Sequence, residues 1–133
     1  MIMNLRLSVA AIAALVALGR AAEADILVGG PGDAREAQLN GTLICSFFNG
    51  GSNAVSINTP EIWSSTVGRV AIFDNTCRSP LAPQKTCQYA SKYLQRAIYA
   101  CRAITGGVEE NIFGTMQIYS STGQLLLSLP MRK

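Results

Sequence analysis

The sequence predicts an all-β fold, an antiparallel β-sandwich of about seven strands. From Gly41 onward, short stretches rich in β-branched and aromatic residues alternate with clusters of Gly, Pro, Asn, Asp and Ser, which favour turns. The turns recur roughly every ten residues, which is the spacing of a small sandwich or barrel. Four cysteines form an even set that suits two disulfide bonds in one small domain.

Residues 1–24 have the features of a signal peptide. Arg6 supplies a basic start, residues 7–19 are uncharged and mostly apolar, and the segment ends in Ala-Glu-Ala, a pattern that signal peptidase cleaves. We therefore expect cleavage between Ala24 and Asp25, and an exported protein that is periplasmic or secreted. A membrane anchor is the alternative, but spanning a bilayer takes about 20 apolar residues. We expect no transmembrane segment after the signal is removed.

The segment 25–39 begins with the Gly- and Pro-rich sequence DILVGGPGD and is expected to be a flexible leader. Its GGPGD sequence is unlike a phosphate-binding loop, because the motif needs a preceding strand, a following helix and usually Lys-Ser/Thr. Residues 40–133 then form a single β-sandwich domain with room for one core.

The strands are expected where apolar and β-branched residues alternate or cluster between turns. Thr59-Pro60 is expected to break a strand, and Ser120 to Gly123 indicates a β-hairpin turn in which glycine supplies a positive φ. The expected strands are Thr42–Phe48, Ala54–Asn58, Glu61–Val67, Arg69–Phe73, Cys87–Ala90, Ala97–Ile104, Gly114–Tyr119 and Gln124–Leu129.

The stretch 87–104 admits two interpretations. Its apolar residues recur at helical spacing, which predicts an amphipathic helix at about 89–101 and an α+β fold. The same residues also fit two strands joined by a polar corner at Ser91–Arg96. We favour the two strands.

The four cysteines allow three disulfide pairings. A structural zinc site would use them differently, in close pairs such as CxxC, and the sequence has no such pair. Disulfides are therefore favoured, in keeping with an oxidising compartment.

Two stretches together resemble a known family. CSFFNGGSNAVSI followed by DNTCRSPLAPQKTC is similar to the bacterial immunoglobulin-like domains of the abnormal-spindle/hydin type, and the similarity covers most of residues 42–130. The closing GTMQIYSSTGQLLLSLP is similar to the last hairpin of small exported bacterial proteins of uncharacterised function. The matching residues are Asn49, Gly50, Thr76, Cys77, Leu81, Pro83 and Cys87.

This resemblance implies an immunoglobulin-like sandwich with a Cys77–Cys87 link in a loop. Cys45 on an early strand and Cys101 on a late one, with Tyr99 two residues before it, fit an inter-sheet bridge of the immunoglobulin type. By the chain-entropy model the two links stabilise by roughly 3 and 4 kcal/mol respectively.

The composition argues against catalysis. The sequence contains no histidine, which removes Ser-His-Asp and Cys-His nucleophiles and imidazole-bound metals. No catalytic residue, cofactor or metal ligand is predicted, and the protein is not expected to be an enzyme. A small histidine-independent hydrolase is the least favoured alternative. The net charge of +3 is scattered, so no nucleic-acid partner is expected.

Domains of the resembled family are mostly binding, scaffolding or targeting modules. We therefore expect an exported, non-enzymatic module that binds a protein or cell-envelope component, with a fimbrial-type structural subunit as the alternative. Aromatic side chains anchor many interfaces, although in a small domain they also fill the core. We favour the interpretation that Trp63, Tyr89, Tyr93 and Tyr119 fill the core and its rim, and a binding surface formed by these four residues is the alternative.

Overall fold

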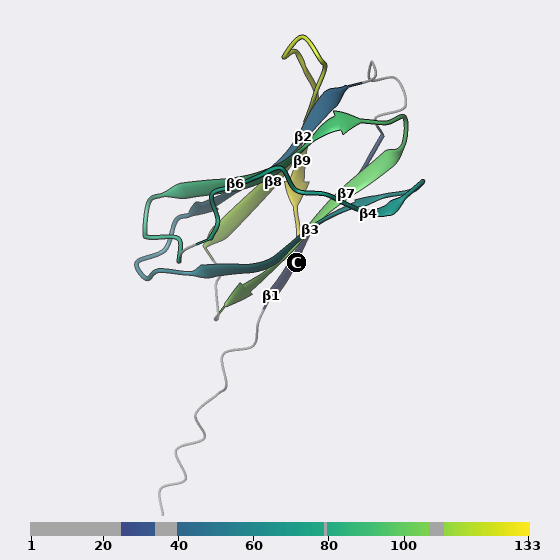
Figure 1. Ribbon diagram of the computed structural model, residues 1–133. Helices are drawn as coiled ribbons and strands as arrows, with labels where there is room; N and C mark the ends of the chain where they lie inside the picture. The colour runs from purple at the N-terminus through teal and green to yellow at the C-terminus, as the bar shows by residue number, and fades with distance from the viewer. Residues whose placement is uncertain (1–24, 34–39, 79, 107–110) are drawn as a thin grey trace, which may run out of the picture.

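The computed structural model describes residues 25–33, 40–78, 80–106 and 111–133, which contain nine strands and no helix. The strands form two antiparallel sheets that lie one over the other (Figure 1). The four-stranded sheet has the order β1-β7-β3-β4, and the five-stranded sheet has the order β5-β6-β2-β8-β9. The strands are β1 (Asp25–Asp33), β2 (Gly41–Asn49), β3 (Ser56–Ser64), β4 (Gly68–Val70), β5 (Asp74–Asn75), β6 (Thr86–Leu94), β7 (Ile98–Gly106), β8 (Ile112–Tyr119) and β9 (Leu125–Met131). The all-β sandwich is confirmed.

The core lies between the two sheets and follows the two-residue period of a strand. In β2, Leu43, Cys45 and Phe47 are buried, whereas the residues between them are partly exposed. In β7, Tyr99, Cys101 and Ala103 point inward in the same way. Each sheet therefore presents one apolar face to the core and one face to solvent.

Residues 89–101 form strands, so the helical alternative is wrong. Strands β6 and β7 are joined by residues 95–97, a shorter corner than expected. Tyr93 is an extra residue in β6, with φ 58°, because Gly41 lies opposite Leu94 while Thr42 lies opposite Lys92. This bulge returns Leu94 to the core. The bulge interrupts the two-residue period of the buried residues in β6, and this interruption makes the apolar spacing resemble that of a helix.

The expected flexible leader is wrong for residues 25–33, which form β1 and pair with β7 along most of their length. Leu27 is buried, and a Cβ on Gly29 would lie only 2.6 Å from Met131 Cγ. The glycines that suggested a loop thus allow β1 to pack closely on β9. Residues 34–39 and the expected signal peptide, including Ala24, lie outside the described residues.

The expected break at Thr59-Pro60 is also wrong, because β3 continues through both residues. Asn58 lies opposite Ile104 and Glu61 lies opposite Arg102, so β3 contains one extra residue there. Thr59 takes up the distortion with φ 47°. As a result, the side chains after the bulge change face.

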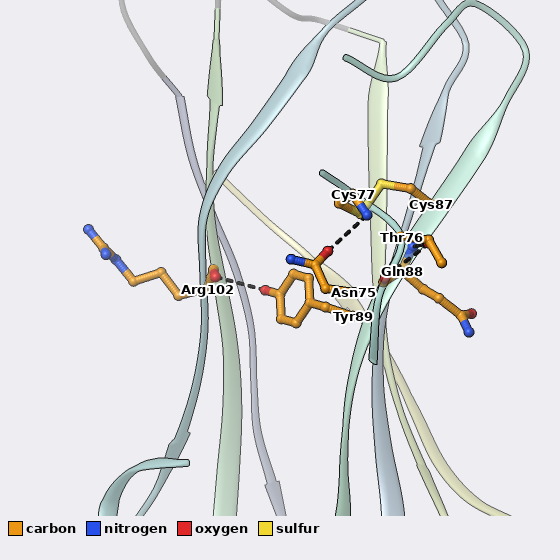
Figure 2. The surroundings of a disulfide bond; sticks show 7 residues. All are labelled: Asn75, Thr76, Cys77, Cys87, Gln88, Tyr89 and Arg102. Carbon is orange, nitrogen blue, oxygen red and sulfur yellow. Dashed lines mark hydrogen bonds between the residues drawn. A yellow bond between two sulfur atoms is a disulfide. The ribbon is translucent and has the colours of Figure 1, made fainter. Parts of the chain in front are cut away.

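Both expected disulfides are present. The long bridge, Cys45–Cys101, joins β2 to β7 across the core with a Cα–Cα distance of 6.0 Å. The short bridge, Cys77–Cys87, ties the chain after β5 to β6, with a Cα–Cα distance of 5.1 Å (Figure 2). Beside it, the Cys77 backbone N–H donates to Asn75 Oδ1 at 2.8 Å.

The two edges of the sandwich are each held by the chain itself. At one edge, Val28 of β1 and Arg132, just after β9, exchange two backbone hydrogen bonds of 2.8 Å. At the other edge, the chain leaves the four-stranded sheet at β4 and joins the five-stranded sheet at β5.

Within the described residues, no helix is long and apolar enough to cross a membrane.

Candidate functional site

The four aromatic residues considered for the core or for one binding surface lie in different places. Trp63 is on the outer face of the four-stranded sheet and is 44% exposed. Tyr89 is fully buried in the core. Tyr93 and Tyr119 belong to the five-stranded sheet. Tyr93 is exposed at the β6 bulge, where it packs edge-to-face on Phe73, and Tyr119 lies on β8. The four residues therefore do not share one surface, and the core interpretation is confirmed for Tyr89.

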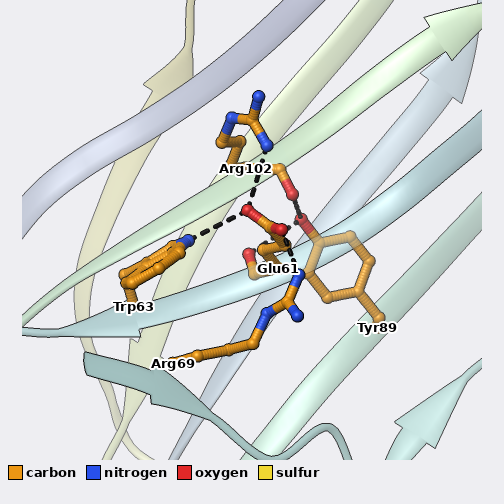
Figure 3. Close-up of polar contacts among 5 residues, drawn as sticks. All are labelled: Glu61, Trp63, Arg69, Tyr89 and Arg102. Atoms are coloured by element: carbon orange, nitrogen blue, oxygen red, sulfur yellow. Dashed lines mark hydrogen bonds and ion pairs between the residues drawn. The ribbon is translucent and has the colours of Figure 1, made fainter. Parts of the chain in front are cut away.

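Tyr89 connects the two sheets through the core. Its hydroxyl donates to the Arg102 carbonyl oxygen at 2.7 Å, and the Glu61 carbonyl oxygen lies 3.5 Å away (Figure 3). Its ring stacks on Phe47 with a centroid separation of 5.7 Å. Burial raises the pKa of Tyr89 well above its usual 10.0. Tyr89 thus holds in place the two strands that carry Glu61 and Arg102.

A polar cluster centred on Glu61 includes Trp63 on the outer face (Figure 3). The Trp63 indole N–H donates to Glu61 Oε2 at 3.0 Å, and Arg102 donates to the same oxygen at 3.0 Å. Arg69, from β4, donates to the other carboxylate oxygen, Glu61 Oε1. The β3 bulge makes this possible, because it turns both Glu61 and Trp63 outward toward the neighbouring arginines.

The cluster keeps Glu61 ionised. The hydrogen bond from Trp63 is the largest influence that lowers its pKa, with further lowering by Arg102 and Arg69, while burial acts in the opposite direction. The Glu61 side chain is only 9% exposed, whereas the Arg69 side chain is 61% exposed. Two guanidinium groups and one carboxylate leave the cluster with net positive charge, and Arg69 is its most exposed charged side chain.

Apolar side chains continue the face beside the cluster. Ile26 and Val28 project from β1 and are both exposed, and Val28 lies opposite Arg102 in the register. Ala100 of β7 lies opposite Trp63. The Trp63 face, defined here by Ile26, Val28, Glu61, Trp63, Arg69, Ala100 and Arg102, therefore joins an aliphatic patch to a tryptophan and two arginines.

The carboxylates of Glu61, Asp74 and Asp25 are all held by cationic side chains. Both oxygens of the Glu61 carboxylate accept hydrogen bonds, which leaves it poorly placed to transfer a proton. Asp74 is paired with Lys92 at 3.0 Å, and Asp25 with Lys133 at 2.5 Å. In the part of the chain that the structure describes, no group of three or more acidic, Cys or His side chains could hold a metal.

Sequence reasoning found Trp63 but missed Glu61, Arg69 and Arg102. The Glu-x-Trp spacing was a usable signal, because residues two apart share a face of a strand. The arginines come from β4 and β7, so their approach depends on long-range strand pairing.

No protein-family model, curated protein or solved structure matches this chain.

Proposed function

We propose that the chain is an exported, non-enzymatic module that binds a protein partner through the Trp63 face. The observation that carries this proposal is an exposed tryptophan held by a carboxylate between two arginines. Tryptophan and arginine are enriched among the residues that dominate binding energy. Because Glu61 fixes all three side chains before binding, less conformational entropy is lost when a partner docks.

The chemistry of the face defines the partner. Ile26 and Val28 offer aliphatic surface, and the exposed Arg69 guanidinium has further N–H groups to donate. We expect the partner to place an apolar side chain near Trp63 and a carboxylate near Arg69. Such a contact gains both apolar burial and charge-assisted hydrogen bonds.

Export rests on two supports. Two disulfide bonds are consistent with an oxidising compartment, and residues 1–24 have the sequence features of a signal peptide. Mass spectrometry of the protein isolated from its native cells tests this. The expected N-terminus is Asp25, and a chain that retains residues 1–24 in the cytoplasm would contradict export.

Site-specific photo-crosslinking tests the binding face. A photoreactive residue in place of Val28 should form adducts with the partner in native cells, whereas the same residue in place of Ser121, exposed in the turn before β9, should not. Adding Trp63→Ala to the Val28 probe should abolish the adducts while the protein remains folded. Adducts that form equally at both positions, or that survive Trp63→Ala, would contradict the assignment of the face.

The structural-subunit alternative involves strand exchange between copies. The Val28–Arg132 bridge favours the module, because it occupies the edge between β1 and β9. Sedimentation of the purified protein separates the two, since a strand-exchanging subunit forms polymers and a binding module stays at a fixed small size.

A further inference from the structure

The outer face of the five-stranded sheet differs in chemistry from the Trp63 face. The outward positions of β2 and β8, two of its three interior strands, hold no acidic or basic side chain. In β2 they are Thr42, Ile44, Ser46 and Phe48, and in β8 they are Phe113, Thr115, Gln117 and Tyr119. Lys92 of β6 lies to the side and is paired with Asp74. The face thus combines aromatic rings with uncharged hydroxyl and amide groups.

A groove runs across this face. Phe48 and Phe113 stack with a centroid separation of 6.5 Å and an interplanar angle of 27°, and Phe113 is 61% exposed. One shallow depression beside this pair is lined in part by Ser46, Thr86 and Thr115. A second depression shares Ser46 and Thr86 with the first and continues to Gln88. The groove, defined here as these two depressions together, therefore has an aromatic end and a more polar end.

We propose that this groove binds a neutral oligosaccharide, at a site separate from the Trp63 face. A sugar ring presents aliphatic C–H groups on its faces and hydroxyl groups around its rim. The Phe48–Phe113 pair offers an apolar surface for the C–H groups. Ser46, Thr86 and Gln88 can both donate to and accept from hydroxyl groups.

The absence of charged side chains at the outward positions of β2 and β8 favours a neutral ligand. Nucleic acids and acidic glycans carry negative charges that Lys or Arg would neutralise, and the outward positions of β2 and β8 hold neither residue. A second copy of the chain fits less well, because serine is depleted from protein interfaces and Ser46 lies at the middle of the groove.

The length of the face favours a chain of several sugars. Phe113 and Tyr119 lie on the same face of β8, six residues apart, which corresponds to about 20 Å along a strand. Tyr119 is partly exposed and its hydroxyl lies 3.4 Å from Gln117 Oε1. It provides a second aromatic contact beyond the groove.

Isothermal titration calorimetry with three neutral hexasaccharides, cellohexaose, chitohexaose and maltohexaose, tests the proposal. We expect saturable binding of at least one of them by the disulfide-bonded protein. Phe113→Ala should weaken it at least about fivefold, which corresponds to about 1 kcal/mol, because the exposed ring is no longer there to stack on a sugar. Trp63→Ala, on the opposite sheet, should leave the affinity unchanged, so the two sites can fail independently.

Three results would overturn the proposal. The first is no saturable binding of any of the three sugars at millimolar concentration. The second is sugar binding that Phe113→Ala does not weaken although the variant retains wild-type circular dichroism. The third is a concentration-dependent dimer that Phe113→Ala dissociates, which would assign the face to a second copy of the chain.

Discussion

Replacing Tyr89 with phenylalanine removes one hydroxyl from the core and leaves the ring that stacks on Phe47. The lost hydrogen bond is the 2.7 Å contact with the Arg102 carbonyl oxygen, which crosses between the two sheets. A buried hydrogen bond contributes about 1–2 kcal/mol. We therefore expect Tyr89→Phe to lower the free energy of unfolding by that amount near pH 7, and Tm by about 4–8 °C.

The same substitution should make the folding stability less sensitive to alkaline pH. Because burial raises the pKa of Tyr89 above its usual 10.0, the unfolded chain loses this proton at a lower pH than the folded protein. The wild type therefore loses stability as the pH rises above 10.0, by about 1.4 kcal/mol per pH unit for one group. Tyr89→Phe lacks this contribution, so the difference in stability between the two proteins should narrow.

Urea unfolding followed by circular dichroism, at several pH values between neutral and alkaline and with the disulfides intact, measures both effects. Tyr119→Phe is the matched control, since its hydroxyl is partly exposed and makes only a 3.4 Å contact with Gln117. It should change stability by less than about 0.5 kcal/mol. A Tyr89→Phe deficit that stays constant from neutral to alkaline pH would refute the reasoning.

Three further predictions concern the bridges, the core and the polar cluster. Replacing both cysteines of the long bridge with alanine should lower the free energy of unfolding by about 4 kcal/mol, against about 3 kcal/mol for the short bridge, because the paired residues are 56 and 10 apart in the sequence. Urea unfolding of the two variants measures this order, and a larger loss for the short bridge would contradict it. Ser91→Ala should raise stability by about 1 kcal/mol, because its buried Oγ has no hydrogen-bond partner within the described residues; a lower Tm would refute this. The Glu61 carboxylate stabilises the fold at pH values above its usual pKa of 4.5, and this stabilisation is lost as the pH falls. Glu61→Gln should therefore lose less folding stability than the wild type when urea unfolding is repeated at decreasing pH. Equal losses in the two proteins would disprove this prediction.

Local sequence patterns predicted the features that depend on neighbouring residues. The alternation in Thr42–Phe48 matches the burial of β2, and the turn before β9 forms with Gly123 at φ 85°. The cysteine pairing also agrees with the structure. The burial alternation and the turn follow from side-chain period and turn chemistry, whereas the choice among three possible disulfide pairings came from the resemblance to immunoglobulin-type sandwiches and not from the cysteine count.

The remaining features depend on strands far apart in the chain. Pairing of Asp25 with Thr105 makes β1 a strand, and no local signal reports that contact. The bulges at Thr59 and Tyr93 each shift the register by one residue, which changes the face on which later side chains lie. The Trp63 face depends on the first of these bulges, so its composition could not be deduced from strand prediction alone.

The contact between β1 and the end of β9 also concerns aggregation. The apolar run Leu125–Leu129 belongs to an edge strand, and apolar edge strands invite pairing with other chains. Val28 bonds to Arg132 just past that run, and Gly29 lets β1 pack on Met131. A chain shortened by removing residues 25–33 as a dispensable leader would lose this cover. We expect it to form β-rich aggregates, although it would keep all four cysteines.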